Sequence, residues 1–287
     1  MKKQKTKKGK RDPFPFKYPG FISICKEIFK DYRGPITLRQ LFYRLVSIGL
    51  HNTKNQYGNL IKHMTKSRKL GWIGWDKIID LDRHLEKPSS WLDPSDFLDT
   101  VTHAYKRDLQ QGQEFHVEVW SEKTVDIKRI TDKYDIGLLA GGGYESGPAL
   151  YEASERFNDI GKPMKILYLG DLDPSGLCIQ RDIEKRLRDV FHVDFELIRV
   201  LLLQEDILKY NPLPNAAKPA DPRYKEFIKQ YGPNTYEMDT LSPSVMQEKL
   251  ESAIRKNIDI DLYEEQMELW EEGKEEIADF IETWNMR

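Results

Sequence analysis

Apolar residues in the first part of the chain recur three and four positions apart, which is the spacing of an amphipathic helix. Gly34-Pro35 and Gly49 interrupt this pattern, and Thr37 is a residue type that caps a helix N-terminus. The pattern therefore predicts three helices, over residues 21–32, 38–49 and 54–70. In the third helix the expected core positions are Tyr57, Leu60, Ile61 and Met64.

The segment after the third expected helix alternates glycine with large apolar residues. Gly71–Trp75 followed by Lys77–Asp80 predicts a short hairpin. Three helices followed by such a hairpin are typical of a winged helix-turn-helix, an α+β DNA-binding fold whose third helix enters the major groove. We expect this domain over residues 20–87.

From Glu114 onward, short apolar runs alternate with helical patterns, which favours a parallel α/β sheet with helices on both faces. The expected strands are 115–120, 137–140, 164–169 and 195–203, and the expected helices are 124–134, 147–158 and 177–190. Two further helices, 242–257 and 262–284, are expected as a C-terminal extension. The predicted domains are a flexible basic tail over 1–19, the winged helix, a linker over 88–112 with a polar helix from Pro94 to Gln111, and an α/β domain over 113–287.

Composition and charge narrow the function classes. No apolar run approaches the roughly 20 residues of a membrane span, and the lysine-rich start carries no apolar core of a secretory signal. We therefore expect no membrane partner and a cytoplasmic location, nucleoid-associated if the source is prokaryotic.

Residues 1–111 hold 23 Lys and Arg against 11 Asp and Glu, whereas residues 112–287 hold 22 against 36. A basic first half favours binding to double-stranded DNA, because neutralised phosphates release counterions. A solvated surface is the alternative for any such group of charges. The candidate DNA-binding residues are Lys54, Lys62, Lys66, Arg68, Lys69 and Lys123.

Two carboxylates, Asp171 and Asp173, directly follow the apolar run that ends at Leu169. Residues i and i+2 of an extended segment point the same way, so both can face one cation. Glu122 follows another expected strand, and parallel strands collect such residues at one sheet edge. Oxygen ligands favour Mg²⁺, so Glu122, Asp171 and Asp173 are the candidate metal ligands. Glu118 is an alternative to Glu122 as a metal ligand, but it lies inside the expected strand.

The acidic residues Glu122, Asp171 and Asp173 resemble those of a TOPRIM domain, with a Glu after the first strand and a DxD motif later. The segment Arg39-Gln-Leu-Phe-Tyr43 supplies a second motif on the second expected helix. Together they resemble the A subunit of topoisomerase VI and its relative, the meiotic double-strand-break transesterase. The match runs from about Gly34 to the C-terminus and is most similar to the reduced, stand-alone "Mini-A" type.

The resemblance implies a type IIB topoisomerase A-like enzyme, of the isomerase class, that cuts DNA by transesterification. Tyr43 would be the nucleophile and form a 5′-phosphotyrosyl bond, with Arg39 and Arg44 assisting and Mg²⁺ as cofactor. It also implies a homodimer and an unidentified ATPase or regulatory partner as a possible further component. None of the ATP-binding chemistry is in this chain, so strand passage is not expected of it alone.

Two alternatives stay open from the residues themselves. A TOPRIM metallonuclease would cleave with activated water and use Tyr43 structurally, since a tyrosine between Phe42 and Leu45 on an amphipathic helix is often a core residue. A non-catalytic DNA-binding protein would need neither motif. Glu237 and Asp239 are open to three interpretations: further metal contacts, dimer contacts, or acids stabilised at a helix N-terminus.

Overall fold

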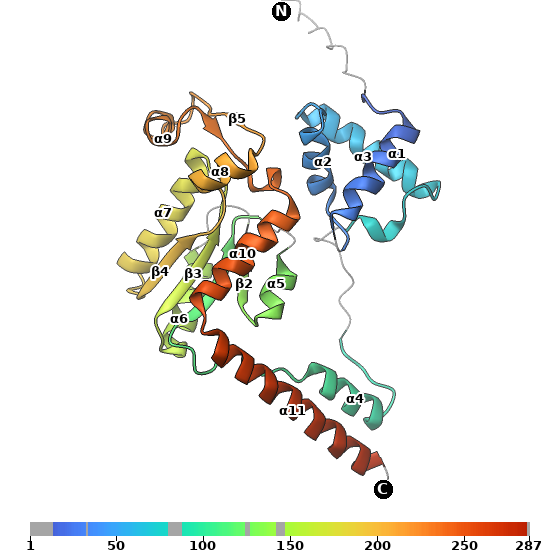
Figure 1. The fold of residues 1–287 in the computed structure, drawn as a ribbon, viewed down its shortest axis with the longest axis vertical. Helices are drawn as coiled ribbons and strands as arrows, with labels where there is room; N and C mark the ends of the chain where they lie inside the picture. The colour runs from blue at the N-terminus through green and yellow to red at the C-terminus, as the bar shows by residue number, and fades with distance from the viewer. Residues whose placement is uncertain (1–13, 33, 80–87, 124–126, 142–146, 286–287) are drawn as a thin grey trace, which may run out of the picture. The chain divides into compact units, whose positions relative to one another are not determined.

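The computed structural model describes residues 14–32, 34–79, 88–123, 127–141 and 147–285. It divides the chain into two compact units, Met1–His84 and Leu85–Arg287 (Figure 1). Each unit has its own buried hydrophobic core, so each can be described by itself.

The first unit contains the three expected helices: α1 (Tyr18–Lys30), α2 (Leu38–Ser47) and α3 (Lys54–Lys69). The hydroxyl of Thr37 accepts the Gln40 N–H at 3.1 Å, while the Gln40 side chain accepts the Thr37 N–H at 2.8 Å. This reciprocal capping satisfies two N–H groups that a helix end leaves without partners. The start of α2 is thereby fixed.

The hairpin expected after α3 is wrong for the described part of that segment, which ends at Ile79. Gly71 has a φ of +70°, and the N–H groups of Trp72 and Ile73 bond back to the Ser67 carbonyl. These residues therefore terminate α3 instead of forming a strand. A short 3₁₀ helix, η1 (Trp75–Lys77), follows, and Ile78 makes a parallel bridge with Ile36. Asp80 lies outside the described residues.

The second unit is built on a four-stranded sheet of β1 (His116–Ser121), β2 (Gly137–Ala140), β3 (Met164–Leu169) and β4 (Phe195–Arg199). The strand order is β2-β1-β3-β4 and every pairing is parallel. The expected parallel sheet is thus confirmed, although β4 ends at Arg199 and not at Leu203. Ser121 is in register with Leu169, so the carboxyl ends of β1 and β3 coincide.

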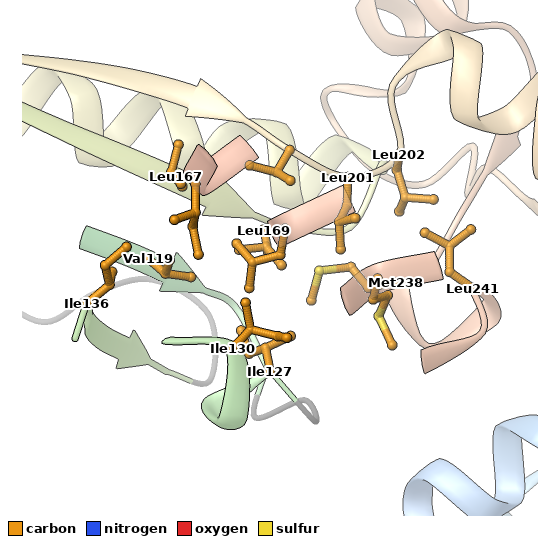
Figure 2. Packing of buried hydrophobic residues seen from close by; sticks show 14 of the residues in the cluster. Val119, Ile127, Ile130, Ile136, Leu167, Leu169, Leu201, Leu202, Met238 and Leu241 are labelled. Carbon is orange, nitrogen blue, oxygen red and sulfur yellow. The ribbon is translucent and has the colours of Figure 1, made fainter. Parts of the chain in front are cut away.

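Helices cover both faces of this sheet, as the alternating pattern predicts. On one face α6 (Gly147–Ile160) and α7 (Pro174–Asp189) bury Trp120 and Tyr168. On the other face α5 (Lys128–Lys133) and α10 (Pro243–Asn257) pack with Val119, Leu167 and Leu169 (Figure 2). Each fully buried side chain of this kind stabilises the unit by about 1.5–3 kcal/mol. Neighbouring residues of one strand contribute to opposite faces because strand side chains alternate.

The remaining elements of the second unit are α4 (Pro94–Ala104), α8 (Gln204–Tyr210), β5 (Asn215–Ala216), α9 (Tyr224–Tyr231), β6 (Asn234–Thr235), η2 (Met238–Thr240) and α11 (Ile260–Asn285). Helix α4 begins at the expected Pro94 but ends at Ala104, well before Gln111. It packs against α11. The Trp270 indole N–H donates to the Tyr105 carbonyl at 2.9 Å, and Arg107 donates to Gln266 at 2.7 Å.

Across the described ranges, no helix combines the length and apolarity needed to cross a membrane.

Candidate functional site

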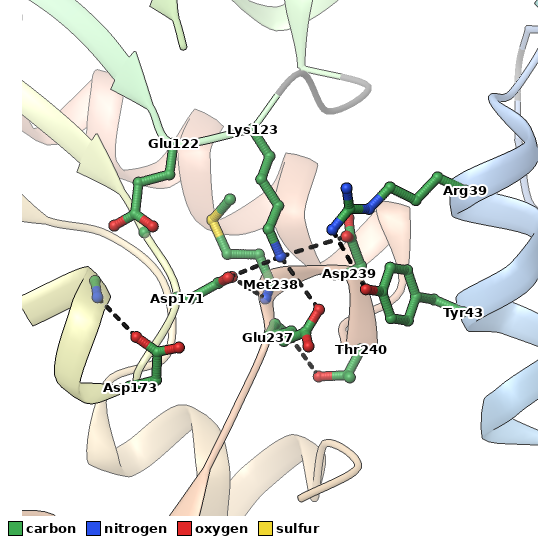
Figure 3. A network of polar contacts seen from close by, with 12 residues as sticks. Arg39, Tyr43, Glu122, Lys123, Asp171, Asp173, Glu237, Met238, Asp239 and Thr240 are labelled. Atoms are coloured by element: carbon green, nitrogen blue, oxygen red, sulfur yellow. Dashed lines mark hydrogen bonds and ion pairs between the residues drawn. The ribbon is translucent and has the colours of Figure 1, made fainter. Parts of the chain in front are cut away.

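The acids singled out from the sequence meet at the carboxyl edge of the parallel sheet. Glu122 directly follows β1, and its N–H donates to the Leu169 carbonyl at 3.0 Å, which extends the pairing with β3 by one step. Asp171 and Asp173 come two and four residues after Leu169. Figure 3 shows the three carboxylates at this edge. The parallel register therefore brings together residues 49 to 51 positions apart in sequence, as the pattern predicts.

The Glu122 carboxyl group is buried, with 8% of the residue exposed. Burial raises its pKa to about 6, and the negative charge of Asp171 adds to the rise, while a hydrogen bond from the Tyr168 hydroxyl opposes it. Burial destabilises the charged form of this carboxyl group, so a cation placed beside it would stabilise that form.

Glycines make room for this carboxylate. A Cβ on Gly170 would lie 2.4 Å from Glu122 Oε1, and one on Gly176 would lie 2.4 Å from the Asp171 carbonyl oxygen. Both distances are far below van der Waals contact, so a side chain at either position would displace the acidic edge. The close approach of backbone to carboxylate explains why glycine occupies these two positions.

Asp171 is held at both of its oxygens. Oδ1 accepts the Met238 N–H at 2.8 Å, and Oδ2 forms an ion pair with Lys123 Nζ at 2.8 Å. Burial raises the pKa of Asp171 even though Lys123 opposes the rise. The side chains of Asp171 and Lys123 are only 12% and 20% exposed, so this ion pair is largely removed from water.

Lys123 is also the centre of a wider acidic group. Its ammonium lies 3.4 Å from Glu237 and 3.5 Å from Asp239. Burial works to lower the pKa of Lys123, but the three carboxylates outweigh it and raise the pKa above its ordinary value. An antiparallel bridge between Leu172 and Tyr236 carries the second acidic segment to this position. Glu237 and Asp239 therefore contact the lysine next to Glu122.

Asp173 caps a helix. Its Oδ1 accepts the Gly176 N–H at 2.7 Å at the start of α7. Within the ranges that the structure describes, no group of three or more His, Cys, Asp or Glu side chains is arranged to hold a metal ion. Asp171 is engaged by Lys123, and Asp173 by the helix terminus, so the expected Mg²⁺ site stays a prediction.

Arg199, which the sequence pattern did not single out, supports the acidic edge from the end of β4. Its Nη2 donates to the carbonyl oxygens of Gly170 at 2.6 Å and Asp171 at 2.7 Å, and Nη1 donates to Gln180 at 3.0 Å. Burial lowers the pKa of Arg199. The available signal was a charged residue placed between the apolar pairs Leu197-Ile198 and Val200-Leu201.

Glu118 has a structural role on the α6 face of the sheet. It is 3% exposed and accepts the Trp120 indole N–H at 2.8 Å. Arg156 binds both of its oxygens, at 2.7 and 2.9 Å. This two-pronged pairing satisfies the buried charge, and Glu122 is the acid that reaches the sheet edge.

In the first unit, α2 presents Tyr43 half-buried, with its ring edge-on to Phe42. Arg39, one turn earlier, donates to the Tyr43 hydroxyl at 3.5 Å, and its guanidinium lies 5.7 Å from the ring centroid. Arg44 instead forms a 2.9 Å ion pair with Asp31 at the end of α1. Of the two candidate assisting arginines, Arg39 is therefore the one that contacts the tyrosine.

The candidate DNA-binding residues of α3 divide into two groups. Four are exposed: Lys54, Lys62, Lys66 and Lys69. Arg68 instead donates to the Trp75 carbonyl at 3.0 Å and stacks on the Trp75 ring, so it holds the segment after α3. Ile61, expected in the core, is 40% exposed on the same helix. Lys123 belongs to the acidic edge of the second unit, where its ammonium is neutralised.

The sequence also contains a glycine-rich turn, Gly141–Gly147, which lies largely outside the described residues, as does the start of the helix expected from Thr124.

No protein-family model matches the chain, and a comparison with curated proteins finds no similar one.

Proposed function

We propose that this chain is a DNA-cleaving transesterase of the topoisomerase VI A type, with Tyr43 as its nucleophile. The observation that supports the proposal is that Glu122 and Asp171 lie together at one edge of a parallel α/β sheet, with Asp173 two residues further on at the start of α7. An α/β sheet whose acids follow two adjacent strands is compatible with a TOPRIM domain. A helix-turn-helix DNA-binding role for the first unit is part of the proposal, supported by its three helices and the exposed lysines of α3. The described part of the segment after α3 does not form the hairpin of a winged helix.

In this proposal the Tyr43 oxygen attacks a DNA phosphorus in line with the 3′-oxygen. A phosphorus–oxygen bond to tyrosine forms, the bond to the 3′-oxygen breaks, and that oxygen takes up a proton. A free tyrosine side chain has a pKa near 10, so a phenol oxygen that attacks needs a positive neighbour as it loses the proton. Arg39, in contact with that hydroxyl, stabilises the developing negative charge.

Glu122, Asp171 and Asp173 are the residues that would hold Mg²⁺. They offer only oxygen ligands, which suit this ion, and the raised pKa values of Glu122 and Asp171 show that burial makes these carboxylates favourable sites for positive charge. Once bound, Mg²⁺ would stabilise negative charge on the phosphate and on the leaving oxygen. The position of Lys123 on Asp171 means that the ammonium and the metal compete for one carboxylate oxygen.

Double-stranded DNA is the proposed substrate, bound through the basic first unit. The resemblance places the tyrosine and the acids of one composite site in different subunits, so we propose a homodimer that nicks both strands. An ATPase or regulatory partner would be required for any strand passage.

A hydrolytic metallonuclease is the second candidate, because the edge-on packing of Tyr43 against Phe42 also suits a structural tyrosine. The two candidates differ in their products: transesterification leaves protein joined to DNA 5′ ends, whereas hydrolysis leaves free ends.

The test is incubation of the protein with end-labelled duplex DNA and Mg²⁺, followed by denaturing electrophoresis. Label retained on the protein, and lost in Tyr43→Phe, is the expected result. Tyr57→Phe is the matched control, because this half-buried tyrosine also packs edge-on against Phe42. Free ends with undiminished cutting by Tyr43→Phe would establish the nuclease instead. Binding without cutting under these conditions would favour a non-catalytic DNA-binding protein.

The acids are tested separately with Asp171→Asn and Asp173→Asn. Asparagine caps a helix as well as aspartate does, so Asp173→Asn removes the charge while the start of α7 is kept. We expect both variants to lose cleavage and to retain DNA binding, since phosphate contacts provide the affinity. Loss of binding in either variant would show that the two units have been assigned the wrong roles.

A further inference from the structure

A cavity of about 250 Å³ lies in the second unit between the first turns of α7, the end of β4, and α9. Its lining includes Arg181, Arg199, Arg223, Phe227, Gln230 and Tyr231. Its lining combines three guanidinium groups with two aromatic rings and two amides, a combination that the transesterase chemistry does not use.

The three arginines come from three different elements. Arg181, on α7, pairs with Glu226 at 3.1 Å, and both side chains are more than half exposed. Arg223, just before α9, binds Asp221 and donates to the Ser175 hydroxyl at 3.1 Å. An exposed ion pair contributes little, so Arg181 can exchange its carboxylate for another anion at small cost.

Arg199 is the group that points most directly to an anionic ligand. The acceptors that its Nη atoms contact, the carbonyls of Gly170 and Asp171 and the amide of Gln180, are all neutral. Its Nε is buried without a hydrogen-bond partner in the described part of the chain. A buried donor without a partner is unfavourable, and more so on a charged group.

An oxyanion in this cavity would give Arg199 a negatively charged partner and its Nε an acceptor, because guanidinium groups bind phosphate oxygens with paired hydrogen bonds. The first residues of α7, Pro174 and Leu177, line the same cavity. The positive end of this 16-residue helix favours a negative group beside it.

The opposite wall of the cavity provides a surface for a flat ring. Phe227 and Tyr231 stack with their centroids 5.3 Å apart at an interplanar angle of 28°, and Tyr231 is 40% exposed. Gln230 adds an amide with donors and an acceptor to this lining, whereas the Gln180 amide is bonded to Arg199 and Glu184. The volume lies just below the roughly 300–1,000 Å³ of sites for drug-sized ligands, so we expect a compact ligand, no larger than one nucleoside with its phosphate.

We propose that this cavity binds a nucleoside monophosphate group, with the phosphate on Arg199, Arg181 and Arg223 and the base against Tyr231. This ligand is either a free nucleotide or the 5′-phosphorylated end of a DNA strand. The proposal does not depend on transesterification by Tyr43, and it can fail or succeed independently of it.

Isothermal titration calorimetry of the full chain with deoxyadenosine monophosphate tests the proposal, with deoxyadenosine as the ligand that lacks the phosphate. We expect the nucleotide to bind at least tenfold more tightly than the nucleoside. We also expect Arg181→Gln and Arg223→Gln each to weaken binding about tenfold, whereas Arg255→Gln, an exposed arginine on α10, leaves it unchanged. These variants keep Arg199, whose bonds to the loop after β3 make its own replacement a risk to folding.

No binding of the nucleotide, equal affinity for nucleotide and nucleoside, or full affinity in both arginine variants would each overturn the proposal. The source of the ligand is determined by competition. A 5′-phosphorylated hexanucleotide that displaces the mononucleotide, where the unphosphorylated strand does not, identifies a DNA end. Failure of both strands to compete identifies a free nucleotide.

Discussion

Replacement of Lys123 by methionine is the most direct test of the electrostatics at the sheet edge. Methionine keeps a long side chain but removes the ammonium that contacts Asp171, Glu237 and Asp239. Three carboxylates would then face one another without the cation, and Asp171 would remain buried. The folded second unit should therefore lose stability.

The magnitude follows from the geometry. Breaking a buried ion pair by removing one partner costs roughly 3–5 kcal/mol. The side chains of Lys123 and Asp171 are 20% and 12% exposed, so some water reaches the pair and we expect a loss of about 2–4 kcal/mol. For a unit of this size each kcal/mol lowers Tm by about 2–4 °C.

Urea unfolding of the full chain, followed by circular dichroism and by the fluorescence of its six tryptophans, among them the buried Trp120, measures this loss. Lys128→Met is the matched control, because Lys128 pairs with Asp132 in an exposed i,i+4 contact and should cost less than about 0.5 kcal/mol. In a double-mutant cycle with Asp171→Asn, the double variant should lose about 1–3 kcal/mol less unfolding free energy than the sum of the two single variants. A Lys123→Met variant as stable as the control, or simple additivity in the cycle, would refute this account of the edge.

Three further outcomes are expected. Gly176→Ala should lower the free energy of unfolding by about 1–3 kcal/mol, since its Cβ would press on the Asp171 carbonyl; an unchanged urea midpoint would contradict the close contact. Tyr168→Phe removes the donor that lowers the pKa of Glu122, so an NMR titration should find the pKa of that carboxyl above the wild-type value, and a fall would show that another group controls it. Burial lowers the pKa of His116, so the unfolded chain binds protons more readily, and the stability of the folded state should decrease as the pH falls through about 6.5. His116→Gln should remove that part of the pH dependence, and an unaltered pH profile would assign it to other groups.

The parallel sheet and the meeting of the acids could be predicted because their causes are local. Each strand is a short apolar run, and the helices between strands have apolar residues at helical spacing. A parallel sheet with helices on both faces buries the apolar residues of the strands and of the helices. Once the strands are parallel, residues that follow them must share an edge, as Glu122 and Asp171 do.

Contacts between distant segments could not be predicted in the same way. Lys123 and Asp239 lie 116 residues apart, and nothing in either segment indicates the other. The bridge between Leu172 and Tyr236 and the Met238 N–H bond to Asp171 bring the two segments together, and neither contact has a repeating sequence pattern.

The segment after α3 illustrates a different limit. Glycines and large apolar residues favour a hairpin and a helix end equally, and the choice depends on backbone angles. The positive φ of Gly71 and the two bonds to the Ser67 carbonyl select the helix end. Arg68 then donates to the Trp75 and Ile78 carbonyls, which no surface pattern of charges would reveal.

The pairing of α4 with α11 has a practical consequence for dissecting this protein. Tyr105 packs so closely on Gly273 that a Cβ there would lie 2.7 Å from its hydroxyl, and the Trp270 indole bonds to the Tyr105 backbone. An isolated second unit cloned from Gln113 would therefore expose the side of α11 that these residues cover and would tend to precipitate. A fragment starting near Pro88 keeps that surface covered and is the better choice for expression.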